Sequence, residues 1–363
     1  MKSEINILKE RLVEIAHLVS TLALLEWDQQ IGMPEKASDS RAKSIAHLSS
    51  LAHRHYVNLD HDLLLTKLKE AVDSRKILSG KDKALILETW KNYEREKKIP
   101  ESLVKEMAEL TSRAHSVWAE ARKQNKFSLF EPYLAKIVSL KQKQAKAIGY
   151  KNSPYDALID IYEPGMTAHE ASLILGDLKE FLIPFIQQVK LSKKKIQSGT
   201  GFDGKSKFDI ETQRLFNEML AEHIGFDTKA GKIAVSTHPF TSGFHPHDVR
   251  FTTRYKDNDL FHAIGSTIHE TGHALYEQGL PASEYGLPLG EPASLSIHES
   301  QSRLWENNVG RSLSFWTHYF PQLQEHFPGR FGKIKVFQFY KGINKIKTSF
   351  IRTEADELTY HFH

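Results

Sequence analysis

Apolar residues recur every three or four positions through most of the first 190 residues. The segments ILKERLVEIAHLVSTLALL and SLVKEMAELTSRAHSVWAEARK show this spacing, and charged residues fill the remaining positions. This period is typical of amphipathic helices, and long charged helices without strand patterns favour antiparallel packing. The pattern predicts an N-terminal helical region over residues 1–190, with breaks near Met33 and Pro100.

Residues 191–209, LSKKKIQSGTGFDGKSKFD, are rich in lysine, serine and glycine and carry few large apolar side chains. This composition predicts a solvated loop. The glycines do not match the spacing of a phosphate-binding loop, which disfavours that role. The loop therefore separates the N-terminal region from a C-terminal region, residues 210–363.

The C-terminal region mixes helical and strand patterns. KIAVSTHPF and DVRFTTRY are rich in β-branched residues and predict two short strands. The segment that follows predicts a helix capped by Asp257 or Asn258 and ended at Gly279, with further helices over residues 292–310 and from about residue 331. The predicted fold is mainly α, with a small β-sheet beside the helix that ends at Gly279.

Composition and charge narrow the class of protein. The 363 residues are 40% hydrophobic and 26% charged, which is ordinary for a globular protein. A net charge of +4 gives no reason to expect nucleic-acid binding. The chain has no cysteine, so any metal must be held by His, Asp or Glu. The N-terminus lacks a signal-peptide pattern and no apolar run is long enough to span a membrane, so we expect a soluble cytoplasmic protein.

The stretch IHETGHAL, residues 268–275, has the chemistry of a metal site. His269 and His273 are four residues apart and would share one helix face, with Glu270 beside the first. His-Glu-x-x-His is a zinc-peptidase signature in which the glutamate is the general base. The pattern alone leaves open a second interpretation, in which both histidines are core or surface residues.

A catalytic zinc needs a third protein ligand. In SLSIHESQSRLWE, Glu299 falls early in a separate helical segment, after its start, and could approach the histidines from the side. Two histidines and a glutamate form a known catalytic zinc set. His298 could orient a ligand or a substrate carbonyl. A glutamate such as Glu299, taken by itself, is more often a solvated helix residue than a ligand. The joint occurrence of the three residues favours a metal site.

Five ordered motifs resemble the M32 family of metallocarboxypeptidases, the thermostable carboxypeptidase 1 family. They are His238–Phe240 (HPF), Asp248–Thr252 (DxRxT), His269–His273 (HExxH), His298–Gln301 (HES-Q) and Ile351–Glu357 (IRxxADE). Residues 24–42 are similar to the N-terminal signature of the family. The resemblance covers essentially the whole chain.

The resemblance implies metal ligands at His269, His273 and Glu299, and Glu270 as general base on metal-activated water. It also implies one divalent ion per chain, Zn²⁺ or Co²⁺, and a zincin-type fold of long helices around a deep groove. Members release single amino acids from the free C-termini of peptides and commonly form homodimers.

A carboxypeptidase must also hold the terminal carboxylate of its substrate, and an arginine pairs bidentately with such a group. Arg352 is the first candidate and Arg250 the second, each with a structural ion pair as the alternative. His238 could contact substrate or brace a strand end. We expect Asp248 to order a ligand histidine, and His262 to be structural.

The family continues past the IRxxADE motif into a Gly-x-x-Gln-Asp-x-His-Trp motif, whereas this chain ends at ELTYHFH. The sequence is therefore expected to be a truncated member, or one whose remainder lies on another chain. Two alternatives to a carboxypeptidase stay open: a metal-binding but catalytically silent helical interaction protein, and an endopeptidase on the same metal helix.

Overall fold

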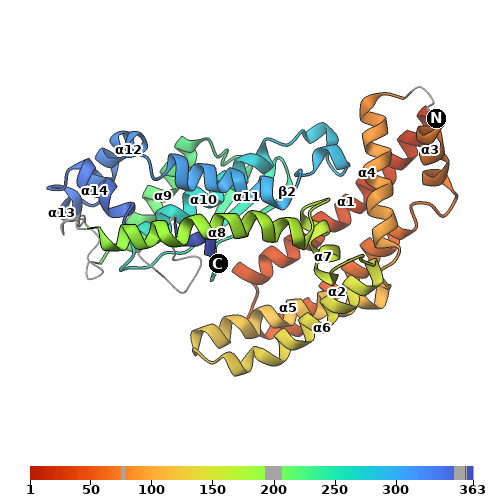
Figure 1. Cartoon of the computed structure of the whole chain (residues 1–363), viewed down its shortest axis with the longest axis horizontal. Coiled ribbons are helices and arrows are strands. Elements are labelled where there is room, and N and C mark those ends of the chain that lie inside the picture. Colours follow the sequence, from red (N-terminus) through yellow and green to blue (C-terminus); the bar gives the residue numbers. More distant parts are fainter. Residues whose placement is uncertain (75–77, 193–206, 347–355, 357, 363) are drawn as a thin grey trace. The chain divides into compact units, whose positions relative to one another are not determined.

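The structure is a computed structural model that describes residues 1–74, 78–192, 207–346, 356 and 358–362. It divides into two compact units, each built from three stretches of chain (Figure 1). Unit 1 comprises Met1–Gly165, Ser242–Val249 and Glu277–Ala293. Unit 2 comprises Met166–Thr241, Arg250–Tyr276 and Ser294–His363.

The stretch Met1–Gly165 of unit 1 is helical, which confirms the prediction for this part of the chain. Leu8 on its first helix, Leu65 on its third and Ile86 on its fourth are fully buried in one apolar cluster. These side chains lie on the apolar faces that the spacing predicted. The helices are α1 (Lys2–Ile31), α2 (Ser38–Val57), α3 (Leu64–Asp73), α4 (Gly80–Glu96), α5 (Glu101–Lys123), α6 (Glu131–Ile148) and α7 (Pro154–Tyr162).

Unit 2 carries the remaining long elements. Its helices are α8 (Ala168–Leu191), α9 (Ile210–Ile224), α10 (Leu260–Gln278, whose last two residues are grouped with unit 1), α11 (Leu295–Arg303), α12 (Leu313–His326), α13 (Pro328–Phe331) and α14 (Val336–Ile343). A π-helix, η5 (Leu304–Val309), directly continues α11. Although α8 lies within the predicted N-terminal region, it is part of unit 2. Of the predicted loop 191–209, residues 193–206 lie outside the described residues.

An aromatic core fixes the helices of unit 2. Trp316 on α12 is fully buried, and its indole N–H donates to the carbonyl of Gly310 at 2.7 Å. The ring centroid of Phe339 on α14 lies 4.5 Å from that of Trp316. Ile268 on α10 belongs to the same cluster. Figure 1 shows α12, α13 and α14 gathered at one end of this unit. This core therefore anchors the helix that carries the two histidines of the signature.

A small sheet has three strands, β1 (Gly231–Val235), β2 (Thr241–His245) and β3 (Asp248–Thr253), in the order β1-β3-β2. The predicted strands correspond to β1 and β3. The sequence analysis missed β2, TSGFH, because it contains a glycine and buries only Phe244. The sheet confirms the predicted mainly α fold with a small β element.

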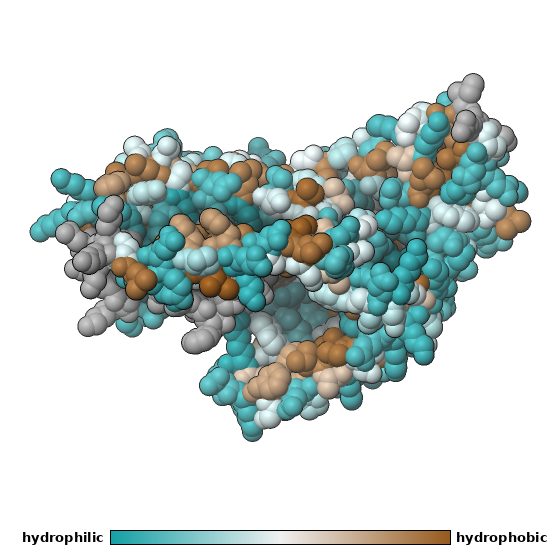
Figure 2. All heavy atoms as spheres, in the orientation of Figure 1, coloured by the Kyte–Doolittle hydropathy of each residue, from teal (hydrophilic) through white to brown (hydrophobic). Residues whose placement is uncertain are grey.

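Helix α8 exposes several large apolar side chains. They are Leu173, Ile174, Leu175, Phe181, Ile183, Phe185 and Leu191. Figure 2 shows brown patches along this helix, and the rings of Phe181 and Phe185 stack 5.7 Å apart. None of the helices in the described part of the chain combines the length and the apolar character of a membrane span.

Candidate metal centre

Helix α10, which carries the signature residues, is capped at its N-terminus and packs one face into the core. The side chain of Asp259 accepts a hydrogen bond from the backbone N–H of His262 at 3.1 Å. The prediction of Asp257 or Asn258 as the cap is therefore wrong, because the helix begins at Leu260 and Asp259 immediately precedes it. Ile264 and Ile268 face the aromatic core. His269 and His273 lie on the other side of the helix, away from this core.

Three side chains from α10 and α11 converge as the sequence predicted. The Oε2 atom of Glu299 lies 3.3 Å from Nε2 of His273 and 3.8 Å from Nε2 of His269. Their ligand atoms all lie within 4.8 Å of one another. Among the described residues, this is the one group of three or more His, Asp or Glu side chains gathered closely enough to hold a metal ion.

The convergence depends on a close approach of two helices at Gly272. A Cβ atom built on Gly272 would lie 2.6 Å from Cα of Ser302 and 2.8 Å from the carbonyl oxygen of Gln301. Both are backbone atoms of α11, so no side-chain rotation could relieve the contact. The absence of a side chain at Gly272 therefore lets α11 bring Glu299 up to the histidines.

Both histidines have their second ring nitrogen engaged. Nδ1 of His269 lies 2.9 Å from Oε2 of Glu306, a carboxylate on η5. Nδ1 of His273 lies 2.5 Å from Nδ1 of His298. A histidine that donates from Nδ1 presents the lone pair of Nε2 to a metal. The contacts therefore orient both Nε2 atoms toward Glu299.

The charges of the group favour an ionised Glu299. Burial opposes ionisation, but a hydrogen bond with His273, the charges of the two histidines and a hydrogen bond from Tyr360 lower the pKa of Glu299 to about 2. Burial likewise opposes protonation of His269, but the hydrogen bond and charge of Glu306 outweigh it and raise the pKa of His269. The carboxylate at residue 299 is therefore held in the anionic form that a cation requires.

Glu270 is buried beside this group, at 5% exposure. Its Oε2 accepts a hydrogen bond from the hydroxyl of Thr241 at 2.6 Å, and the same hydroxyl lies 3.2 Å from the carbonyl oxygen of Glu270. Burial raises the pKa of Glu270. A buried carboxyl with an elevated pKa and a fixed orientation has the properties of a general base.

The donor set fits a tetrahedral divalent ion. Ligand atoms about 2.0–2.2 Å from such an ion lie roughly 3.3–3.6 Å apart. The Glu299 oxygen is 3.3 and 3.8 Å from the two imidazole nitrogens, close to that range. Two neutral imidazoles and one carboxylate, with one position left for water or substrate, are the ligand types of a catalytic rather than a structural divalent-metal site.

Glu306→Gln should weaken metal binding, because it removes the charge that fixes the ring of His269 and pairs with Arg303. Loss of such a supporting partner typically costs about 10–100-fold in metal affinity. Competition with a chromophoric chelator measures the dissociation constant. Glu325→Gln, at an exposed position on α12, is the matched control and should leave the constant unchanged. An unchanged constant in Glu306→Gln would show that the carboxylate has no role at the metal.

The other predicted site residues lie at defined places in the fold. Arg250 is on β3, and exposed His238 follows β1, where its carbonyl accepts from the hydroxyl of Ser236 at 2.6 Å. Asp248 begins β3 in unit 1. His262 lies on α10 and outside the group of three. Arg352 lies outside the described residues. Their proposed roles stay predictions.

Four side chains that support the group were not predicted from the sequence. Glu306 contacts His269, Thr241 contacts Glu270, and Tyr360 contacts Glu299. Arg303 contacts both Glu306 and the ring of Tyr360. The one available signal was the i,i+3 spacing of Arg303 and Glu306, which is typical of a helical ion pair.

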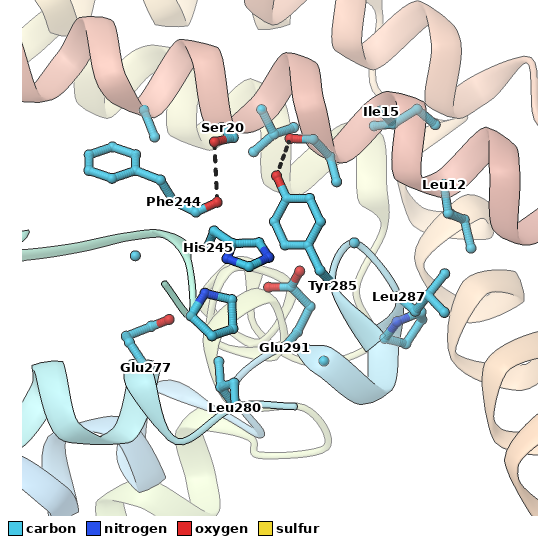
Figure 3. Close-up of a pocket in the computed structure, with 18 of the residues that line it drawn as sticks. Leu12, Ile15, Ser20, Phe244, His245, Glu277, Leu280, Tyr285, Leu287 and Glu291 are labelled. Carbon is cyan, nitrogen blue, oxygen red and sulfur yellow. Dashed lines mark hydrogen bonds between the residues drawn. The ribbon is translucent and has the colours of Figure 1, made fainter. Parts of the chain in front are cut away.

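A cavity of about 350 Å³ lies elsewhere, within unit 1 (Figure 3). Its apolar wall comes from α1, and the segment around Tyr285 and residues of the β2–β3 hairpin close it. The hydroxyl of Tyr285 lies 3.4 Å from the carbonyl oxygen of Ala16, and Ser20 donates to the carbonyl of Phe244 at 3.2 Å. No member of the metal-binding group lines this cavity.

Comparisons with known proteins agree with this geometry. The family model described as carboxypeptidase Taq (M32) metallopeptidase matches residues 7–363. Carboxypeptidase 1 of Bacillus subtilis is 39% identical over 352 residues, covering 97% of this chain and 69% of the relative. Thermostable carboxypeptidase 1 of Thermus thermophilus is 39% identical over 361 residues, covering 96% and 69%. The solved M32 carboxypeptidase of Deinococcus radiodurans R1 is 35% identical, with a TM-score of 0.86 over 99% of this chain and 71% of that one.

Proposed function

The chain belongs to the carboxypeptidase Taq (M32) metallopeptidase family, and from this premise we propose that it releases single amino acids from the free C-termini of peptides. Its relatives are carboxypeptidases that align with it over nearly its whole length, and they support a metal-dependent carboxypeptidase function. The observation that carries the proposal is the convergence of His269, His273 and Glu299 beside the buried carboxyl of Glu270.

The proposed mechanism divides the work among these side chains. His269, His273 and Glu299 would hold one divalent ion, which when bound supplies Lewis acidity toward water and the scissile carbonyl. Glu270 takes a proton from the attacking water and delivers it to the nitrogen of the leaving amino acid. Thr241 donates to one oxygen of Glu270 and so directs the carboxylate while it exchanges the proton.

Several finer features belong to the proposal. We propose Zn²⁺ or Co²⁺ as the ion, since both suit a set of two histidines and a carboxylate. Arg352, or Arg250 in its place, would pair with the terminal carboxylate of the substrate. His298 would fix the ring of His273, as Glu306 would fix the ring of His269. The role expected for Asp248, ordering a ligand histidine, stays a prediction from the sequence. A homodimer and a cytoplasmic location stay predictions from the sequence.

A peptide-trimming assay tests the function. The purified chain is incubated with Zn²⁺ or Co²⁺ and two versions of one peptide, with a free and with an amidated C-terminus. We expect stepwise release of amino acids from the free form only. Cleavage of the amidated form would instead indicate an endopeptidase. Bound metal without any release would indicate the silent interaction protein, and failure to bind either metal would overturn the proposed metal site.

A further inference from the structure

Tyr360 lies against the least buried member of the metal-binding group. Its hydroxyl donates to Oε1 of Glu299 at 3.2 Å. The side chain of Glu299 is 38% exposed, against 21% for His269 and 14% for His273. An exposed glutamate loses rotamer freedom when it is fixed, so a metal ligand of this kind benefits from a second contact that holds it in place.

The two oxygens of Glu299 have separate partners. Oε2 faces both imidazoles, at 3.3 and 3.8 Å, whereas Oε1 accepts from Tyr360. A hydrogen bond to Oε1 opposes rotation of the carboxylate about its last side-chain bond. It also engages one lone pair of Oε1, the oxygen that would be the second donor atom of a bidentate carboxylate, and so disfavours that mode. The contact therefore favours a one-oxygen attachment through Oε2.

Tyr360 is itself held from two sides. On one face, the guanidinium of Arg303 stacks 3.9 Å from the centroid of its ring. Along the backbone, the carboxylate of Asp356 accepts hydrogen bonds from the amides of Leu358 and Thr359, just before Tyr360, at 2.9 and 3.0 Å. The amide of Tyr360 donates to the carbonyl of Asp356 at 2.9 Å. These contacts hold the phenol in place without any contribution from the metal ligands' own side chains.

Arg303 contacts both Tyr360, which holds Glu299, and Glu306, which holds His269. The guanidinium that stacks on Tyr360 also donates to Oε2 of Glu306 at 3.0 Å. The same oxygen of Glu306 contacts Nδ1 of His269. A continuous series of contacts therefore runs from His269 through Glu306, Arg303 and Tyr360 to Glu299.

We propose that Tyr360, stacked on Arg303, is a positioning residue that presents Oε2 of Glu299 to the metal. The proposal rests on the metal site proposed above. Tyr360 acts through Glu299. Loss of its hydroxyl therefore changes how tightly and with how many atoms the ion is held, even in the absence of substrate.

Tyr360→Phe tests the proposal, because it removes the hydroxyl and keeps the ring that stacks on Arg303. Zn²⁺ affinity, measured by chelator competition, should fall about tenfold, at the lower end of the effect of such supporting contacts. The visible absorption spectrum of the Co²⁺-loaded protein should also change, since freeing Oε1 alters the number of donor atoms. Tyr319→Phe, which removes a hydroxyl from the aromatic core of unit 2, is the matched control and should change neither reading.

A double-mutant cycle tests the stacking contact. Arg303→Lys keeps a positive charge near Glu306 but loses the planar guanidinium. Because Arg303 acts on Glu299 through Tyr360, the double variant Arg303→Lys/Tyr360→Phe should lose less affinity than the product of the single losses. Fully multiplicative losses would overturn the proposed route from Arg303 through Tyr360.

The same measurements distinguish failure of the positioning role of Tyr360 from failure of the proposed metal site. If the unaltered chain binds Zn²⁺ and Tyr360→Phe binds it equally well with the same Co²⁺ spectrum, the positioning role is overturned while the metal site stands. A lower melting temperature of metal-free Tyr360→Phe, with an unchanged dissociation constant, would likewise assign Tyr360 to stability alone. If the unaltered chain binds no metal, both proposals fail.

Discussion

Glu270→Gln is expected to abolish C-terminal trimming while leaving metal binding intact. The amide retains the size of the carboxyl and can still accept from the hydroxyl of Thr241, so the buried site keeps its packing. It cannot take a proton from water, and loss of a general base typically costs about 10²–10⁴-fold in rate. The ligands His269, His273 and Glu299 are unchanged, so we expect the unaltered metal content.

Two measurements make this result interpretable. Release of amino acids is followed by quantitative amino-acid analysis, and metal content by elemental analysis of the same samples. Glu222→Gln, at an exposed position of α9, is the matched control and should retain full activity. Trimming by Glu270→Gln at the rate of the unaltered chain would exclude Glu270 as the base. Loss of the metal in that variant would show that Glu270 helps to hold the ion.

Gly272→Ala should be the most damaging small substitution in the metal helix. Its Cβ would lie 2.6 Å from Cα of Ser302, so α11 must move away from α10 and carry Glu299 with it. Overpacking of this kind costs about 1–3 kcal/mol of stability. Displacement of a ligand by even a fraction of an ångström departs from the bond lengths that zinc requires, so metal affinity should fall by about 100-fold or more.

Gly265→Ala provides a matched control on the same helix. A Cβ at Gly265 meets only a ring carbon of Phe261, at 3.9 Å, which is an ordinary contact. Alanine favours a helix interior over glycine by about 1 kcal/mol, so this variant should be as stable as the parent or more so. Chelator competition and thermal unfolding measure both effects. Unchanged metal affinity in Gly272→Ala would contradict the role assigned to the close approach.

Local patterns predicted those features that depend on neighbours in the sequence. The spacing of apolar residues predicted the helices of unit 1, and the spacing of His269 and His273 predicted a shared helix face. The three converging ligands followed from the need of zinc for a third donor. The motifs that resemble those of the M32 family imply the same three residues.

Features that depend on distant segments were not predicted. Thr241 reaches Glu270 across 29 positions, Glu306 reaches His269 across 37, and Tyr360 reaches Glu299 across 61. Apart from the i,i+3 spacing of Arg303 and Glu306, nothing in the local sequence distinguishes these residues from an ordinary exposed threonine, glutamate or tyrosine. The strand β2 was missed for a related reason, since TSGFH gains its strand conformation from pairing with β3 and has weak intrinsic preference.

The π-helix η5, Leu304–Val309, has a consequence for how this part of the chain can evolve. The amide of Gly310 donates to the carbonyl of Trp305, five residues earlier, at 2.7 Å, so this turn holds one residue more than an α-turn. Deleting a single residue here would tighten the turn and swing Glu306 away from His269. The proposed metal site therefore constrains both the number of residues in this segment and the carboxylate of Glu306, whereas the exposed side chains of Leu304 and Asn308 can vary.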